Sequence, residues 1–85
     1  MPNISAIIAD RQKTHGDFDD HAAATQGIKR AIRAYYSDRL TTAQIESLDM
    51  IAHKIGRILA GDPDFADHWN DIAGYAKLIA DRCSK

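Results

Sequence analysis

The sequence is poor in residues that crosslink or break a polypeptide chain. It contains one cysteine, two prolines and five glycines among 85 residues. The single cysteine, Cys83, cannot form a disulfide within the chain, so a disulfide scaffold is excluded and a reducing, cytoplasmic setting is expected. Long stretches without proline or glycine favour helices over strands.

The sequence also lacks a long apolar run and an excess of either charge. No run approaches the ~20 apolar residues that span a bilayer, and no basic segment followed by an apolar one opens the chain. We therefore expect neither a membrane helix nor a secretory signal. The formal net charge is −1, which argues against general nucleic-acid binding but is compatible with a local basic patch. The length predicts one domain, residues 1–85.

Apolar residues recur at three- and four-residue steps along most of the chain, which predicts an all-α protein. The expected helices cover residues 4–13, 17–37, 43–60 and 64–82. Because the connection between the last two is very short, these two should be antiparallel neighbours. The sequence therefore predicts a four-helix bundle built around an antiparallel helical hairpin.

The same periodicity predicts which residues form the core. Two glycines, Gly56 and Gly74, fall inside the predicted hairpin. Each costs about 1 kcal/mol relative to alanine, so we expect close helix–helix approach at both. A chain this short has a small core, and apolar stripes on several helices predict a homo-oligomer, most simply a dimer. The side chains expected to be buried are Ile51, Ile55, Ile58, Trp69, Ile72, Ala76 and Ile79.

Acidic residues gather on both helices of the predicted hairpin. Asp64, Asp67 and Asp71 share one face of the last helix, and Glu46 and Asp49 share a face of the helix before it. Carboxylate oxygens are ligands that Mg²⁺ prefers. The alternative is that the helix dipole favours acidic residues in a first turn, which explains Asp64 and Asp67 well and Asp71 poorly.

A basic pair, Lys54 and Arg57, lies three residues apart on one helix. A guanidinium matches the oxygens of a phosphate, so the pair is a candidate phosphate clamp. The alternative is that both form salt bridges with carboxylates of the last helix. Asp71 is then the expected partner, because antiparallel packing places it level with Lys54.

A glycine-containing turn precedes the second predicted helix. Arg11 and Lys13 lie just before Gly16, and backbone N–H groups that open a helix bind anions. The alternative is an ordinary turn capped by Asp17. None of the four histidines has a partner at the spacing of a helical zinc site, so we expect no zinc.

Three segments carry a family resemblance: KTHGDF at residues 13–18, IAHKIGRIL at 51–59 and DHWNDIAGYA at 67–76. With them, nearly the whole chain resembles a small phage and prophage domain family of unknown function. That family is distantly similar to the all-α nucleoside triphosphate pyrophosphohydrolases of the MazG type, which use E-x-x-E and E-x-x-D pairs to bind Mg²⁺.

This resemblance implies a MazG-like bundle with a Mg²⁺-dependent active site. The motifs depart from the MazG pattern, because the first pair reads E-x-x-D and the second has His68 in place of its first carboxylate. The roles it implies are catalytic for Glu46, Asp49 and Asp71, metal-binding for Asp67 and Asp71, and phosphate-binding for Lys54 and Arg57.

The expected function is nucleotide handling, in the form of Mg²⁺-dependent pyrophosphohydrolysis. Two alternatives stay open, a non-catalytic nucleotide binder and a helical protein-interaction module, so the sequence does not decide whether the chain is an enzyme. The expected partners are a nucleotide or another small phosphate ligand and a second copy of the chain, without general nucleic-acid or membrane binding.

Overall fold

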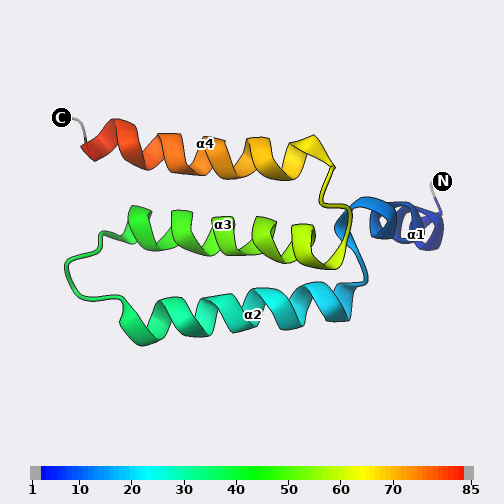
Figure 1. The fold of residues 1–85 in the computed structure, drawn as a ribbon, viewed down its shortest axis with the longest axis horizontal. Helices are drawn as coiled ribbons and strands as arrows, with labels where there is room; N and C mark the ends of the chain where they lie inside the picture. The colour runs from blue at the N-terminus through cyan, green and yellow to red at the C-terminus, as the bar shows by residue number, and fades with distance from the viewer. Residues whose placement is uncertain (1–2, 84–85) are drawn as a thin grey trace.

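A computed structural model describes residues 3–83 and contains four helices and no strand within that range. They are α1 (Ile4–His15), α2 (Phe18–Tyr35), α3 (Thr42–Ala60) and α4 (Ala66–Cys83), shown in Figure 1. The all-α prediction is confirmed, and each helix begins and ends within two residues of its predicted bounds. None of the helices in the described range is both long enough and apolar enough to cross a membrane.

Local capping explains where the helices begin. The Asn3 side chain accepts a hydrogen bond from the backbone of α1, and Asp17 does the same for α2. At α3, Thr41 and Gln44 form a reciprocal capping box, in which each side chain bonds the backbone of the other. Such caps satisfy N–H groups that lack a partner inside the helix.

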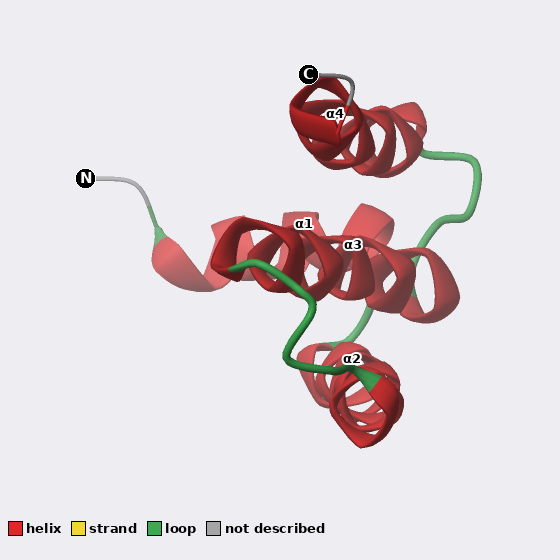
Figure 2. Ribbon diagram, turned by 90° about the vertical axis from the view of Figure 1, so that its left-hand side faces the viewer, coloured by secondary structure: helices red, strands yellow, loops and turns green. Residues whose placement is uncertain are grey.

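The three long helices form a single layer. α3 lies in the middle and packs against α2 on one side and α4 on the other, whereas α2 and α4 do not pack on each other in the described chain. Figure 1 shows α3 antiparallel to both neighbours, and Figure 2 shows the three helices in a row. The radius of gyration is 14.8 Å, against about 12 Å for a compact chain of this length.

This layer buries few apolar side chains. In the described chain, Ala52 is the one hydrophobic residue that is fully buried. The predicted isoleucines of the core are half-buried. The prediction was wrong for Trp69, which is 54% exposed, and for Ala76, which is also exposed. The reason is that a layer of helices covers the seams between neighbours but leaves its two broad faces open.

Glycine allows the closest backbone approaches. A Cβ on Gly56 would overlap the Thr25 hydroxyl of α2, so the predicted close approach is confirmed there. A Cβ on Gly74 would meet nothing within 4 Å, so the same prediction was wrong for α4. Gly16, with φ +80°, lies against the Ala60 carbonyl where the α1–α2 turn crosses the end of α3.

Alanine substitutions at Gly56 and Gly74 should change stability in opposite directions. Both replacements gain about 1 kcal/mol of helix propensity. Gly74→Ala should therefore raise the free energy of unfolding by up to about 1 kcal/mol. Gly56→Ala should lower it by about 1–3 kcal/mol, because α2 must move away from α3. Urea denaturation followed by circular dichroism measures both, and two changes of the same sign would contradict the packing described.

Candidate functional site: a cationic pocket

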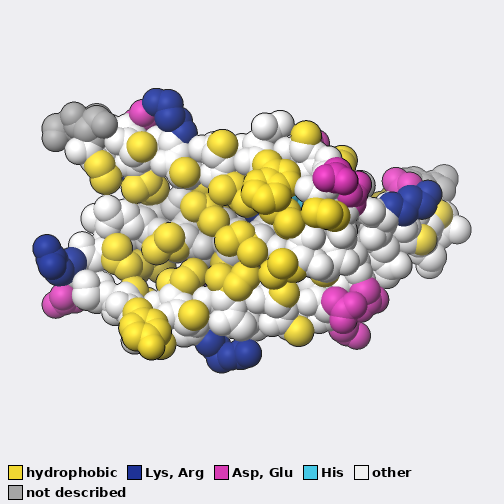
Figure 3. All heavy atoms as spheres, in the orientation of Figure 1, with side chains coloured by type: hydrophobic (Ala, Val, Ile, Leu, Met, Phe, Trp, Pro, Cys, Tyr) yellow, Lys and Arg dark blue, Asp and Glu magenta, His cyan; other side chains and the backbone are white. Residues whose placement is uncertain are grey.

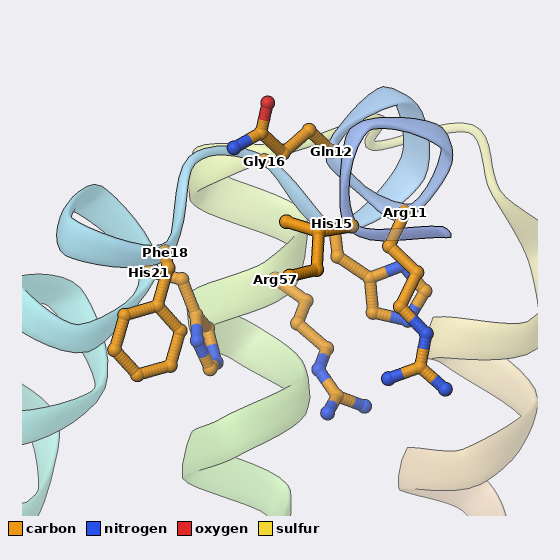
Figure 4. A pocket seen from close by; sticks show the side chains of 8 residues that line it. Arg11, Gln12, His15, Gly16, Phe18, His21 and Arg57 are labelled. Atoms are coloured by element: carbon orange, nitrogen blue, oxygen red, sulfur yellow. The ribbon is translucent and has the colours of Figure 1, made fainter. Parts of the chain in front are cut away.

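A pocket of about 240 Å³ lies where α1, α2 and α3 meet. Figure 4 shows its side chains, which come from all three helices and from the turn between α1 and α2. It is lined by Ile8, Arg11, Gln12, His15, Gly16, Phe18, His21 and Arg57.

Helical spacing places the polar side chains in this pocket. Arg11 and His15 are four residues apart on α1, and Phe18 and His21 are three apart at the start of α2. Residues at these spacings share a helix face. In Figure 4 the side chains of Arg11 and Arg57 extend in the same direction, with their guanidinium groups beside each other.

The Thr14 carbonyl fixes α1 against the rest of the molecule. It accepts hydrogen bonds from the Asp62 backbone N–H at 3.0 Å and from His68 Nε2 at 2.8 Å. His68 is 1% exposed, and its ring lies edge-on to that of His15, with centroids 4.8 Å apart. The C-terminal end of α1, which carries His15, is therefore hydrogen-bonded to the α3–α4 loop and to α4.

The pocket concentrates positive charge. No carboxylate lines it, and within residues 3–83 neither Arg11 nor Arg57 forms a salt bridge. Burial lowers the pKa of His15, and the positive charge of Arg57 lowers it further. Burial is also the largest cause of the lowered pKa of His21, although the hydrogen bond from its Nε2 to the His53 carbonyl acts in the opposite direction.

The predicted contact between Lys54 and Asp71 is confirmed. Lys54 Nζ lies 3.0 Å from Asp71 Oδ2, and the lysine side chain is 11% exposed whereas the aspartate is 48% exposed. The same prediction was wrong for Arg57, which points into the cationic pocket instead. Lys54 therefore lies at the α3–α4 seam, and Arg57, three residues later on α3, lies at the junction with α1.

The remaining predicted carboxylates lie apart. Glu46 lines a groove beside the C-terminal half of α4, whereas Asp67 is exposed in the first turn of that helix. Asp49 is half-buried and shares the face of α3 that Gly56 turns toward α2. Residues 3–83 contain no group of three or more acidic, histidine or cysteine side chains placed to hold one metal ion. The carboxylates of the described chain are therefore spread along α3 and α4 and are not gathered in one cluster.

The first N–H groups of α2 are occupied. Asp17 Oδ2 accepts hydrogen bonds from the backbone N–H of Asp19 at 3.1 Å and of Asp20 at 3.4 Å. The capped-turn alternative is therefore correct, and an anion at this junction would be held by side chains.

Phe18 and His21 were not among the predicted site residues. Phe18 is 72% exposed at the pocket. A signal was present in the spacing of Arg11, His15, Phe18 and His21, which steps by four, three and three across the turn. Arg57 could not be added from local sequence, because it joins the cluster only when α3 packs beside α1.

Comparison with known proteins places the chain in a family. The model of a domain of unknown function, DUF6378, matches residues 3–83. The chain belongs to this family. No curated protein and no solved structure matches the DUF6378 chain.

Loss of the Lys54–Asp71 ion pair, in which the lysine is nearly buried, should destabilise the DUF6378 chain. Asp71→Asn leaves Lys54 nearly buried without a counter-charge, so the free energy of unfolding should fall by about 1–3 kcal/mol. The matched control is Asp81→Asn, which removes the exposed pair with Lys77 and should cost less than about 1 kcal/mol. Chemical denaturation of both variants gives the comparison, and equal small losses would contradict a stabilising role for the Lys54 pair.

Mild acidification should destabilise the DUF6378 chain. The pKa values of His15, His21 and His53 lie below the ordinary 6.5, with burial the largest cause for each. The unfolded chain therefore binds more protons than the folded one, and stability rises with pH. Between about pH 7 and about pH 5.5 the free energy of unfolding should fall as the pH is lowered. Chemical denaturation at several pH values in this range measures this change. His15→Gln should reduce the dependence of the free energy of unfolding on pH. A free energy of unfolding that does not change with pH would contradict the prediction.

Proposed function

We propose that this DUF6378 chain binds a phosphate-bearing small ligand, with nucleotides the expected class, in the cationic pocket. The observation that carries the proposal is the convergence of Arg11, Arg57, His15 and His21 without a lining carboxylate. Like charges held together repel, and an anion relieves that repulsion. Guanidinium groups also bind phosphate oxygens bidentately, which makes arginine suited to phosphate recognition.

The size of the pocket favours a phosphate group over a whole nucleotide. Its volume of about 240 Å³ is below the ~300–1,000 Å³ of pockets that enclose a complete ligand. The exposed ring of Phe18 offers a surface on which a base could stack outside the pocket. A cationic pocket beside an exposed aromatic ring supports a phosphorylated ligand with a planar group.

The non-catalytic form of nucleotide handling is supported best. Asp71 is paired with Lys54, and Glu46 and Asp67 lie near opposite ends of α4. The Mg²⁺-dependent hydrolysis that the MazG and phage-domain resemblance implies stays a prediction, and no single-chain carboxylate cluster supports it. Binding through Arg11 and Arg57 requires no such cluster.

Removing one guanidinium should weaken ligand binding. We expect Arg57→Gln to raise the dissociation constant for ATP or inorganic pyrophosphate by about 10- to 100-fold, because it deletes charge-assisted hydrogen bonds. The matched control is Arg33→Gln, which removes an exposed arginine from the last turn of α2 and should leave the constant unchanged. Isothermal titration calorimetry measures both variants.

Three outcomes separate the functions. A nucleotide ligand would be supported if the parent chain binds ATP more tightly than pyrophosphate and Phe18→Ala loses this preference. Pyrophosphate release from nucleoside triphosphates in the presence of Mg²⁺ would support the hydrolase prediction. Equal binding by the parent chain, Arg11→Gln and Arg57→Gln would place the ligand elsewhere and overturn the proposal.

A further inference from the structure

The two sides of α3 differ in chemistry. Met50, His53 and Arg57 follow one another at steps of three and four, and this row faces the side where α1 and the cationic pocket lie. On the other side, the same spacing gives a row without a charged residue. Its members are Leu48, Ile51, Ile55 and Leu59.

The neighbouring helices continue this uncharged surface. Ala76 and Ile79 of α4 border, with Leu48 and Ile51, a groove of about 350 Å³ to which no charged side chain of residues 3–83 contributes. Trp69, about two turns before Ala76, shares the same side of α4. Figure 3 shows hydrophobic side chains spread across three helices on this face, with lysine, arginine and acidic side chains toward its ends and edges.

On α2 the corresponding side carries Ile28 and Tyr35. It lies away from Lys29, whose Nζ is 3.2 Å from His53 Nε2 on the polar side of α3. Tyr35 is 88% exposed. We call the whole surface the apolar face, and its main members are Ile28, Tyr35, Leu48, Ile51, Leu59 and Trp69.

The exposed area is too large for a chain of this mass. The molecule exposes 6191 Å², whereas a compact monomer of 9.4 kDa exposes about 5,000 Å². The excess is roughly 1,200 Å², and a stable interface covers about 800 Å² of each partner. One partner of similar size, seated on the apolar face, would therefore cover about two thirds of the excess.

We propose that the apolar face binds a second copy of this chain in a two-fold symmetric dimer. A flat, uncharged surface is complementary to itself, because no charge meets a like charge when it is rotated onto itself. With α3 in the middle of the layer, a two-fold axis near Ile51 and Ile55 stacks α3 on its copy. The six long helices then enclose the isoleucines that a single layer leaves half-buried.

The dimer leaves the cationic pocket open, since the two surfaces are on opposite sides of α3. Arg57 lies on the polar side, so Arg57→Gln should leave the dimer intact even where it abolishes ligand binding. Failure of the dimer and failure of the proposed function are therefore separate results.

Charge placed in the apolar face should dissociate the dimer. Leu48 borders the groove and is 37% exposed, so Leu48→Glu is tolerated by the isolated fold but places a carboxylate in the interface. Analytical ultracentrifugation should give the parent chain twice the 9.4 kDa chain mass at about 100 µM, and a dissociation constant at least about tenfold higher for Leu48→Glu. Leu59→Glu repeats the test at a residue that is 68% exposed, so this substitution does not place a charge in the core of the monomer.

The matched control is Leu78→Glu. Leu78 is 53% exposed but lines grooves on the polar side of α4 with Tyr75, so its substitution should change the dissociation constant less than about threefold. Circular dichroism confirms that each variant is folded. A monomeric parent chain would overturn the proposal and would leave another protein or another segment as the occupant of the apolar face. A dimer that is disrupted by Leu78→Glu, but not by Leu48→Glu and Leu59→Glu, would also overturn it.

Discussion

The structure depends on one middle helix that packs against two others. α3 meets α2 along one seam and α4 along the other, and no contact closes the layer into a ring within the described chain. At the first seam Gly56 lets the helices approach closely. At the second, the Ser47 hydroxyl donates a 2.8 Å hydrogen bond to the Tyr75 carbonyl, and Lys54 pairs with Asp71. Polar and small residues occupy these seams, so the larger apolar side chains remain on the faces.

The open layer gives α3 two surfaces with different chemistry. On the polar side, α1 is fixed by the bonds to the Thr14 carbonyl, and its docking brings Arg11 and His15 to Arg57. On the other side, no further helix of residues 3–83 covers the isoleucine and leucine row of α3. A ligand on the first surface and a second chain on the other would together complete a structure that one chain leaves half covered.

The sequence predicts what local chemistry decides. Helix ends follow from caps such as Asp17 and Thr41, which act on N–H groups two or three residues away. The Lys54–Asp71 pair was also predictable, because a short loop sets the register of two antiparallel helices. Burial was less predictable. Periodicity identifies the apolar side of α4, but it does not predict whether another helix covers that side, and Trp69 is 54% exposed.

The candidate site was predicted in part for the same reason. Arg57 and the turn around Gly16 were each predicted as candidate anion-binding features, yet only tertiary packing shows that they line one pocket. Gly56 and Gly74 were indistinguishable in sequence, since each is a glycine inside a helix. They differ because one lies at a seam and the other on an open surface.

The central claim is that one face of the layer is covered by a second chain while the other stays open. Isotope-filtered nuclear Overhauser spectroscopy on a mixture of labelled and unlabelled chains tests it most directly, since it detects only contacts between molecules. We expect intermolecular signals from the methyl groups of Leu48, Ile51 and Ile55, and none from Ile8 at the cationic pocket. Intermolecular signals confined to α1, or none at all at high concentration, would contradict the account.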